Sequence, residues 1–201
     1  MNILEQGGLM MWPILALSIL SLAVIAERFL AYTTRRFPSP DKLDPALALF
    51  RDNQAESALK HMEDAAPFYA PLFAAFFSAQ PVERKEKDIL HAGEGLLFAL
   101  NRRLEFLATV ATAAPLMGLL GTVIGMISTF SNLSASGNVD ITLLANGIWQ
   151  ALLTTAAGLA VALPALLAHR WFCNQYEKTA YAMQHAANVF LDQLKTPGDR
   201  A

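Results

Sequence analysis

The sequence predicts an all-α membrane protein with three transmembrane helices. Three stretches carry no charged residue: residues 9–26, 106–139 and 141–168, the last two separated only by Asp140. A helix needs about 18 apolar residues to cross a hydrocarbon core of about 30 Å, and each stretch reaches that length. The composition agrees, because the 201 residues are 54% hydrophobic and only 16% charged. An ordinary soluble domain of this size carries more polar surface.

The basic residues predict the orientation of the chain. All fifteen Lys and Arg residues lie either between the first and second uncharged stretches or after the third. Because basic segments stay in the cytoplasm, we expect a periplasmic N-terminus, a periplasmic hairpin and a cytoplasmic C-terminus in a bacterial inner membrane. The first stretch is followed by Glu27-Arg28 and not by a small-residue cleavage site, so we expect it to be retained as a membrane helix.

These observations divide the chain into seven segments. In order, they are a periplasmic N-terminus (1–8), a first transmembrane helix (9–32), a cytoplasmic helical loop (33–103), a second transmembrane helix (104–132), a periplasmic hairpin (133–141), a third transmembrane helix (142–169) and a cytoplasmic helical tail (170–201).

The loop and the tail are predicted to be helical. Asp44 and Pro45 are typical of an N-cap and a first helical residue. Across residues 82–107 apolar side chains recur at helical spacing, with no proline before Pro115. This pattern predicts one long helix that rises from the cytoplasm into the second crossing. The tail continues the third crossing in the same way, since residues 166–195 contain neither proline nor glycine.

No pattern in the sequence is typical of an enzyme. The four His residues and the single Cys173 share no metal-ligand spacing, and neither a phosphate-binding loop nor a nucleophile elbow occurs. Acidic residues alternate with the basic ones, so the sequence has no cluster of basic residues of the kind that binds nucleic acids. We expect no enzymatic activity, no metal, no cofactor and no nucleic-acid partner.

Small and polar residues recur at helical spacing inside the membrane. In the second crossing they are Pro115, Gly118, Gly121, Thr122, Gly125, Ser128 and Thr129. In the third they are Asn146, Gln150, Thr154, Thr155, Gly158, Ala162 and Pro164.

Two interpretations of these residues stay open. Small residues let helices approach closely, so we expect helix packing or subunit contacts at Pro115, Gly118, Gly121, Gly125, Gly158 and Pro164. A polar side chain in hydrocarbon needs a partner or water, so the candidates for lining an ion pathway are Thr122, Thr155, Gln150, Thr154 and Asn146. The alternative for the polar residues is packing, because a hydroxyl can donate to a carbonyl of its own helix.

Residues 107–129, LATVATAAPLMGLLGTVIGMIST, and 147–167, GIWQALLTTAAGLAVALPALL, resemble the second and third transmembrane helices of the MotA/TolQ/ExbB proton-channel family. The patterns APxxGLxGTVxG and ALxxTAxGLxxAxPA are long and specific. The ExbB/TolQ branch is the more similar, because the MotA branch has four crossings. The start of the chain, with Gly7-Gly8 and Trp12-Pro13, is similar to that branch too, so the resemblance covers all three crossings.

The resemblance implies a homo-oligomeric ring, a pentamer in the best-known relatives, around the membrane helices of an ExbD/TolR-like partner. Ion flow through the ring would move this partner, which energises a TonB- or TolA-like protein for outer-membrane transport or envelope maintenance. The partner's membrane aspartate would carry the ion, while Thr122 and Thr155 hydrate and orient it. We place Arg102, Arg103 and Glu105 at the cytoplasmic mouth of the pathway, and we expect membrane lipid around the ring.

Gln150 departs from the family's usual pattern, which has a glutamate at this position. An amide does not titrate near neutral pH, so this chain supplies no ionisable side chain in the membrane core. Three explanations compete: the partner's carboxylate alone carries a proton, sodium is the coupling ion, or the ring does not conduct. Two further classes stay open beside an ion-driven subunit, namely a passive scaffold for single-span partners and a small transporter.

Overall fold

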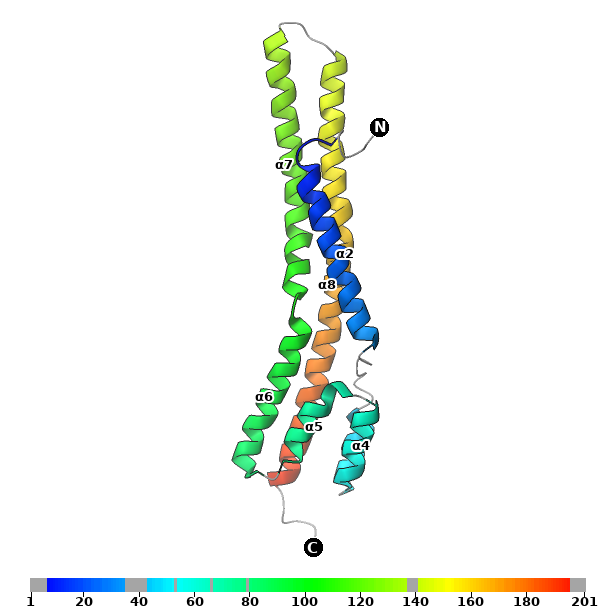
Figure 1. The fold of residues 1–201 in the computed structure, drawn as a ribbon. Helices are drawn as coiled ribbons and strands as arrows, with labels where there is room; N and C mark the ends of the chain where they lie inside the picture. The colour runs from blue at the N-terminus through cyan, green and yellow to red at the C-terminus, as the bar shows by residue number, and fades with distance from the viewer. Residues whose placement is uncertain are drawn as a thin grey trace. The chain divides into compact units, whose positions relative to one another are not determined.

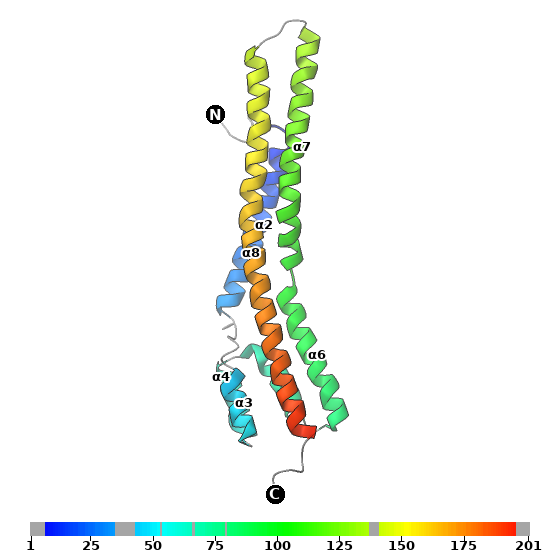
Figure 2. The same ribbon diagram turned by 180° about the vertical axis from the view of Figure 1, so that it is seen from behind.

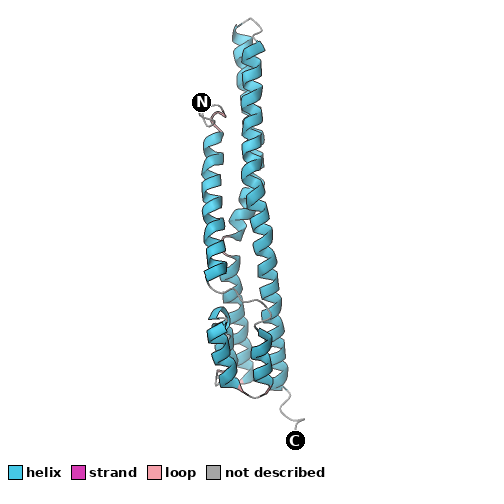
Figure 3. Cartoon of the chain, turned by 90° about the vertical axis from the view of Figure 1, so that its right-hand side faces the viewer, coloured by secondary structure: helices cyan, strands magenta, loops and turns pink. Residues whose placement is uncertain are grey.

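In a computed structural model of the chain, all the regular structure of the described residues is helical (Figure 3). The described residues are 7–34, 43–52, 54–65, 67–78, 80–136 and 141–195. Most of the predicted N-terminus (1–6), the start of the loop (35–42), part of the hairpin (137–140) and the end of the tail (196–201) lie outside them.

Three helical segments are long and apolar enough to cross a membrane: Met11–Thr33, Val82–Ala135 and Ile141–Asp192. They belong to four helices, which are α2 (Met11–Thr34), α6 (Val82–Asn101), α7 (Leu104–Ser136) and α8 (Ile141–Lys195). The predicted all-α class with three candidate membrane helices is therefore confirmed. The remaining helices are short: α3 (Leu43–Arg51), α4 (Ala55–Ala65), η2 (Pro67–Tyr69) and α5 (Ala70–Phe76).

The chain divides into two compact units. Unit 1 consists of Met1–Glu27 and Arg103–Trp171, and unit 2 of Arg28–Arg102 and Phe172–Ala201. In unit 1, α2, α7 and the first part of α8 lie side by side (Figure 1). Its buried cluster is made mainly of small side chains: Val110, Ala114, Ala162 and Ala165. Many large apolar side chains of unit 1 remain exposed, for example Leu116 (65%), Ile127 (63%) and Leu152 (61%).

Unit 2 has a core of large side chains. Its helices α3, α4, α5 and α6 and the last part of α8 (Figure 2) enclose one hydrophobic cluster. At its centre Phe76 stacks on Phe190 with ring centroids 4.4 Å apart. Phe73, Tyr69 and Met62 are also fully buried there. The predicted helix start at Asp44 lies one residue inside α3, which begins at Leu43.

The prediction of one long helix from residue 82 into the second crossing is wrong. The helix is interrupted between α6, which ends at Asn101, and α7, which begins at Leu104. Arg103 has a φ of 71°, the only positive value among the described non-glycine residues. A residue in the left-handed conformation cannot continue a right-handed helix. The spacing of apolar residues does not predict such a conformation, so nothing in that spacing indicated the interruption.

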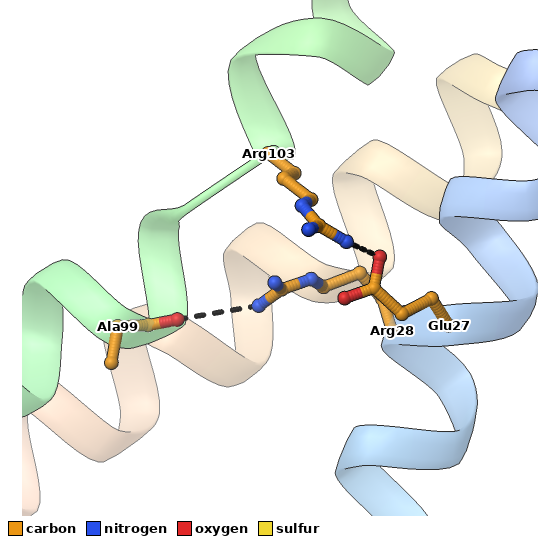
Figure 4. A network of polar contacts seen from close by, with 4 residues as sticks. All are labelled: Glu27, Arg28, Ala99 and Arg103. Atoms are coloured by element: carbon orange, nitrogen blue, oxygen red, sulfur yellow. Dashed lines mark hydrogen bonds and ion pairs between the residues drawn. The ribbon is translucent and has the colours of Figure 1, made fainter.

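Tertiary contacts of α2 explain how the interruption is stabilised (Figure 4). In unit 1, Glu27 forms an ion pair with Arg103, and both side chains are about half exposed. In unit 2, Nη1 of Arg28 donates to the carbonyl oxygen of Ala99 at 3.2 Å. The last carbonyls of a helix lack partners within it, so the guanidinium of Arg28 satisfies one of those in the final turn of α6.

The other long helix is continuous. α8 runs through 55 residues from Ile141 to Lys195, as the absence of proline and glycine after residue 165 predicts. Pro164 lies inside α8 and Pro115 inside α7 without ending either helix. Proline is tolerated in membrane helices when neighbouring groups satisfy the freed carbonyls.

Candidate functional site

The candidate site lies where α7 and α8 of unit 1 pack at glycines. A Cβ atom at Gly118 would lie 3.0 Å from the carbonyl oxygen of Thr154 and 3.0 Å from Cα of Thr155. A Cβ atom at Gly158 would lie 3.1 Å from Cα of Gly118. The same Cβ atom would lie 2.5 Å from the carbonyl oxygen of Ala114, so a side chain at Gly158 would force the backbones apart, and one at Gly118 would be tightly packed.

The same close packing continues along α7. Beyond Gly118, Gly121 lies against the side chain of Thr154, whose Oγ1 would be 2.8 Å from a Cβ atom at Gly121. Gly125 faces Ala151 at an ordinary distance, 3.6 Å to its Cβ. The predicted helix-packing role of Gly118, Gly121, Gly125 and Gly158 thus has a geometric basis within one chain, while their role between copies stays a prediction.

Thr155 and Thr122 donate to consecutive carbonyl groups of α7. We call the contact between α7 and α8 at these glycines the α7–α8 seam. Oγ1 of Thr155 on α8 donates across it to the carbonyl oxygen of Gly118 on α7 at 3.2 Å. Oγ1 of Thr122 donates to the next carbonyl, that of Leu119, at 2.7 Å. Each hydroxyl has one hydrogen to donate and keeps oxygen lone pairs. Both threonines are partly exposed in the single chain.

The remaining polar candidates have different surroundings. Thr154 is only 1% exposed, and its Oγ1 donates to the carbonyl oxygen of Ala151 in its own helix at 2.7 Å. Asn146 is exposed. Gln150 is half-buried, and its amide nitrogen is so near Gly8 that it would clash with a Cβ atom there. The structure therefore brings Thr154 and Thr155 of α8 against Gly121 and Gly118 of α7, with Gln150 one turn before Thr154 on α8, and leaves Asn146 exposed.

The predicted prolines and the residues of the predicted cytoplasmic mouth differ in exposure. Pro115 is half-buried and Pro164 is exposed. Arg102, Arg103 and Glu105 are exposed, and of these Arg103 is paired with Glu27. The sequence prediction did not include Glu27, although a signal for it existed. Glu27 is the first charged residue after the uncharged stretch 9–26, so it had to lie near one end of the crossing.

Comparison with known proteins identifies the family. The sequence profile of the "MotA/TolQ/ExbB proton channel family" matches residues 68–185. The chain belongs to this family. The matched region contains the whole α7–α8 seam, including Thr122, Gln150 and Thr155.

Several curated relatives place the chain nearer to one branch of the family. The putative biopolymer transport protein ExbB-like 1 of Synechocystis sp. is 36% identical over 174 residues, 82% of this chain and 67% of the relative. The biopolymer transport protein exbB1 of Vibrio cholerae is 26% identical over 190 residues, 92% and 83% of the two chains. The Tol-Pal system protein TolQ of Haemophilus influenzae is 37% identical over 98 residues, 49% and 41%. The predicted ExbB/TolQ branch is confirmed.

Membership in the MotA/TolQ/ExbB family gives the seam a context. The family is associated with channels and transport rather than with enzymatic catalysis. Together with its three apolar helices, this makes the chain a multi-pass membrane protein. Its candidate site therefore consists of hydroxyls and backbone carbonyls between two membrane helices.

Proposed function

We propose that this protein is the channel-forming subunit of an ion-driven machine. With an ExbD/TolR-like single-span partner it energises a TonB- or TolA-like protein for outer-membrane transport or envelope maintenance. Family membership supports the ion-channel class, and relatives named as biopolymer transport and Tol-Pal proteins support the choice between these systems. As in the sequence prediction, five copies form a ring in the inner membrane, with the N-terminus periplasmic and the C-terminus cytoplasmic.

The observation that carries the proposal is the pair of threonine hydroxyls on consecutive α7 carbonyls. Thr122 and Thr155 remain partly exposed, although residues 106–139 and 141–168 carry no charged side chain. Hydroxyl oxygens at this depth hydrate an ion or orient a carboxylate that a partner inserts. The oxygens are held by their bonds to Gly118 and Leu119, so they need little reorganisation when an ion arrives.

Not every predicted pathway residue is supported equally. The 1% exposure of Thr154 favours the packing interpretation for this residue. Gln150 is one turn before Thr154 on α8 and partly exposed, so we retain it beside the pathway. Asn146 belongs nearer the end of the crossing, and Arg102, Arg103 and Glu105 belong at the cytoplasmic mouth.

The energy source is the transmembrane potential. One elementary charge that moves down this potential releases about 2.3 kcal/mol per 100 mV, so a few ions suffice for a conformational step. Gln150 cannot take up and release a proton near neutral pH. We therefore assign the proton to the partner's membrane carboxylate, with sodium coupling and a non-conducting ring as the competing outcomes.

Two variants at Gln150 separate these outcomes. The chain is expressed with its ExbD/TolR-like partner, and energised function is assayed across external pH and sodium concentration. Gln150→Glu is expected to assemble and to retain activity, because a carboxylate beside a hydrated pathway is solvated or stays protonated. Gln150→Leu is expected to assemble with impaired coupling. Failure of Gln150→Glu to assemble together with full activity of Gln150→Leu would remove Gln150 from the pathway, and a dependence on sodium in place of pH would identify the ion.

A passive scaffold is the second candidate function, and one contact favours it. The hydroxyl of Thr155 already bridges two helices, which is what a packing residue does. A scaffold predicts that complexes with the partner form normally but show no ion-dependent activity. Native mass spectrometry of the purified complex, followed by the activity assay on the same sample, decides between the two functions.

A further inference from the structure

The turn that precedes α2 closes onto the α7–α8 seam. At Gly8 the backbone has a φ of +71°, a left-handed conformation that favours glycine. The amide nitrogen of Met11 donates to the carbonyl oxygen of Gly8 at 3.2 Å, which fixes the turn to the first residue of the helix. We call residues 7–10 the N-terminal turn.

Gln150 of α8 holds one side of this turn. Its amide nitrogen would clash with a Cβ atom at Gly8, and its Cδ and Cγ lie 3.4 and 3.9 Å from that Cβ position. Gly8 is therefore favoured by its φ, and a side chain at residue 8 would displace the amide of Gln150 from its present position. A longer side chain at residue 8 and the amide of Gln150 exclude each other.

Gly121 of α7 holds the other side. A Cβ atom at Gly121 would lie 3.2 Å from Cβ of Met10 and 2.8 Å from Oγ1 of Thr154. Met10 and Thr154 thus approach one point on α7 together. Thr154, which lies at this point, is only 1% exposed.

We propose that Gln150 is a positioning residue that seats the N-terminal turn over the seam, and that the seated turn covers the hydroxyl of Thr154. The seat is built from Gln150 and Gly121, one residue on each helix of the pair. Gln150 thereby gains a role that needs no titratable proton, which fits an amide at this position. The proposal needs neither an ion gradient nor a partner chain, so its failure is separate from failure of the proposed function.

The test measures how fast a thiol in the turn reacts. In a Cys173→Ala background, Met10→Cys is exposed to N-ethylmaleimide in the purified full-length protein in mild detergent. Leu9→Cys is the matched control, because Leu9 is the neighbouring residue and is 74% exposed. The thiol at residue 10 is expected to react much more slowly than the thiol at residue 9.

Removing the seat should release the turn. Gln150→Ala is expected to raise the rate at residue 10 by about tenfold, the change produced when one contact of ordinary strength is lost, without changing the rate at residue 9. Asn146→Ala removes a similar amide one turn earlier on α8, from an exposed position, and should leave both rates unchanged. Circular dichroism confirms that each variant keeps its helix content.

A second pair of variants tests the seat from α7. Gly121→Ala places a methyl group against Met10 and Thr154 and is expected to raise the rate at residue 10. Gly125→Ala meets only Ala151 at 3.6 Å and should not. Equal rates at residues 9 and 10 in the parent, no effect of Gln150→Ala, or the same effect from Asn146→Ala would each overturn the proposal.

Discussion

The two units of this protein pack α8 in different ways. In unit 1, α8 presents Gly158 and Ala151 to α7, so that the two backbones approach within van der Waals contact. In unit 2, the same helix presents Met183 and Phe190 to a cluster of large aromatic and aliphatic side chains. One continuous helix therefore supplies both a close-approach seam and an aromatic core.

The difference follows from the solvent that each unit is expected to meet. In lipid, large apolar side chains gain nothing by leaving the surface, so helices associate through close packing of small residues and through interhelical hydrogen bonds. In water, burial of large apolar side chains is the main driving force. Unit 1 leaves Leu116 and Ile127 exposed, whereas in unit 2 α6 begins with the charged sequence VERKEKD.

The largest effect is expected for a core aromatic of unit 2. Phe76 is 1% exposed, and its loss in Phe76→Ala leaves a cavity that costs about 3–5 kcal/mol of unfolding free energy. Denaturant unfolding of the full chain in mild detergent, followed by circular dichroism, measures the change. Phe98→Ala is the control, because Phe98 is 76% exposed and should change this free energy by at most about 0.5 kcal/mol. Equal effects of the two variants would contradict the aromatic core.

Replacing a glycine by alanine should change the free energy of unfolding in opposite directions in the two units. In unit 1, Gly118→Ala pushes a Cβ atom to 3.0 Å from backbone atoms of Thr154 and Thr155, which overpacks the seam at a cost of about 1–3 kcal/mol. In unit 2, no atom lies within 4 Å of a Cβ at Gly95, so Gly95→Ala in helix α6 should stabilise by about 0.5–1 kcal/mol. Thermal unfolding of both variants beside the parent checks the sign. Stabilisation by Gly118→Ala would show that the contact between α7 and α8 has room for a methyl group at this position.

A pH-dependent loss of stability should arise in unit 2. Burial raises the pKa of the Tyr69 phenol above its usual value of 10.0, and Tyr69 is fully buried. The folded state therefore holds this proton more tightly than the unfolded state, so the stabilisation is complete below pH 10 and falls as pH rises beyond it. The slope is at most about 1.4 kcal/mol per pH unit for one proton. Unfolding measured from pH 8 to 11 should show the decline, and Tyr69→Phe should lack it; an identical decline in that variant would assign it to other groups.

The smallest effect on stability is expected at Thr155. Thr155→Val keeps the shape of the side chain but removes its bond to the carbonyl oxygen of Gly118. Interhelical hydrogen bonds in membrane proteins contribute about 0.6 kcal/mol on average. The melting temperature should therefore fall only slightly. A loss of stability as large as that of Phe76→Ala would show that Thr155 mainly serves helix packing.

Much of unit 1 could be predicted from the sequence, because its signals are local. Uncharged length marks the crossings, and spacings of three and four residues place the glycines on one helical face. Three of these glycines, Gly118, Gly121 and Gly125, do face residues of α8, whereas the pathway role of Thr122 stays a prediction.

The features that the sequence did not reveal depend on distant contacts. Arg103 ends the long helix pattern with a left-handed backbone, and its partner Glu27 is on a helix far away in the sequence. The contact between Gly8 and Gln150 likewise joins the two sequence segments of unit 1. Periodicity within one segment carries no information about either pairing. The assembly of the unit 2 core from α3, α5 and α8 is hidden for the same reason.

Ion flux through the reconstituted complex tests the central claim most directly. The chain and its ExbD/TolR-like partner are placed in liposomes, a potential is imposed, and proton and sodium entry are recorded for the parent, Thr155→Val and Thr155→Ser. We predict flux in the parent, its retention in Thr155→Ser, which keeps the hydroxyl, and a severe loss in Thr155→Val with the oligomer intact. Parental flux in Thr155→Val, or no ion flux in any of the three, would contradict an ion pathway at the α7–α8 seam.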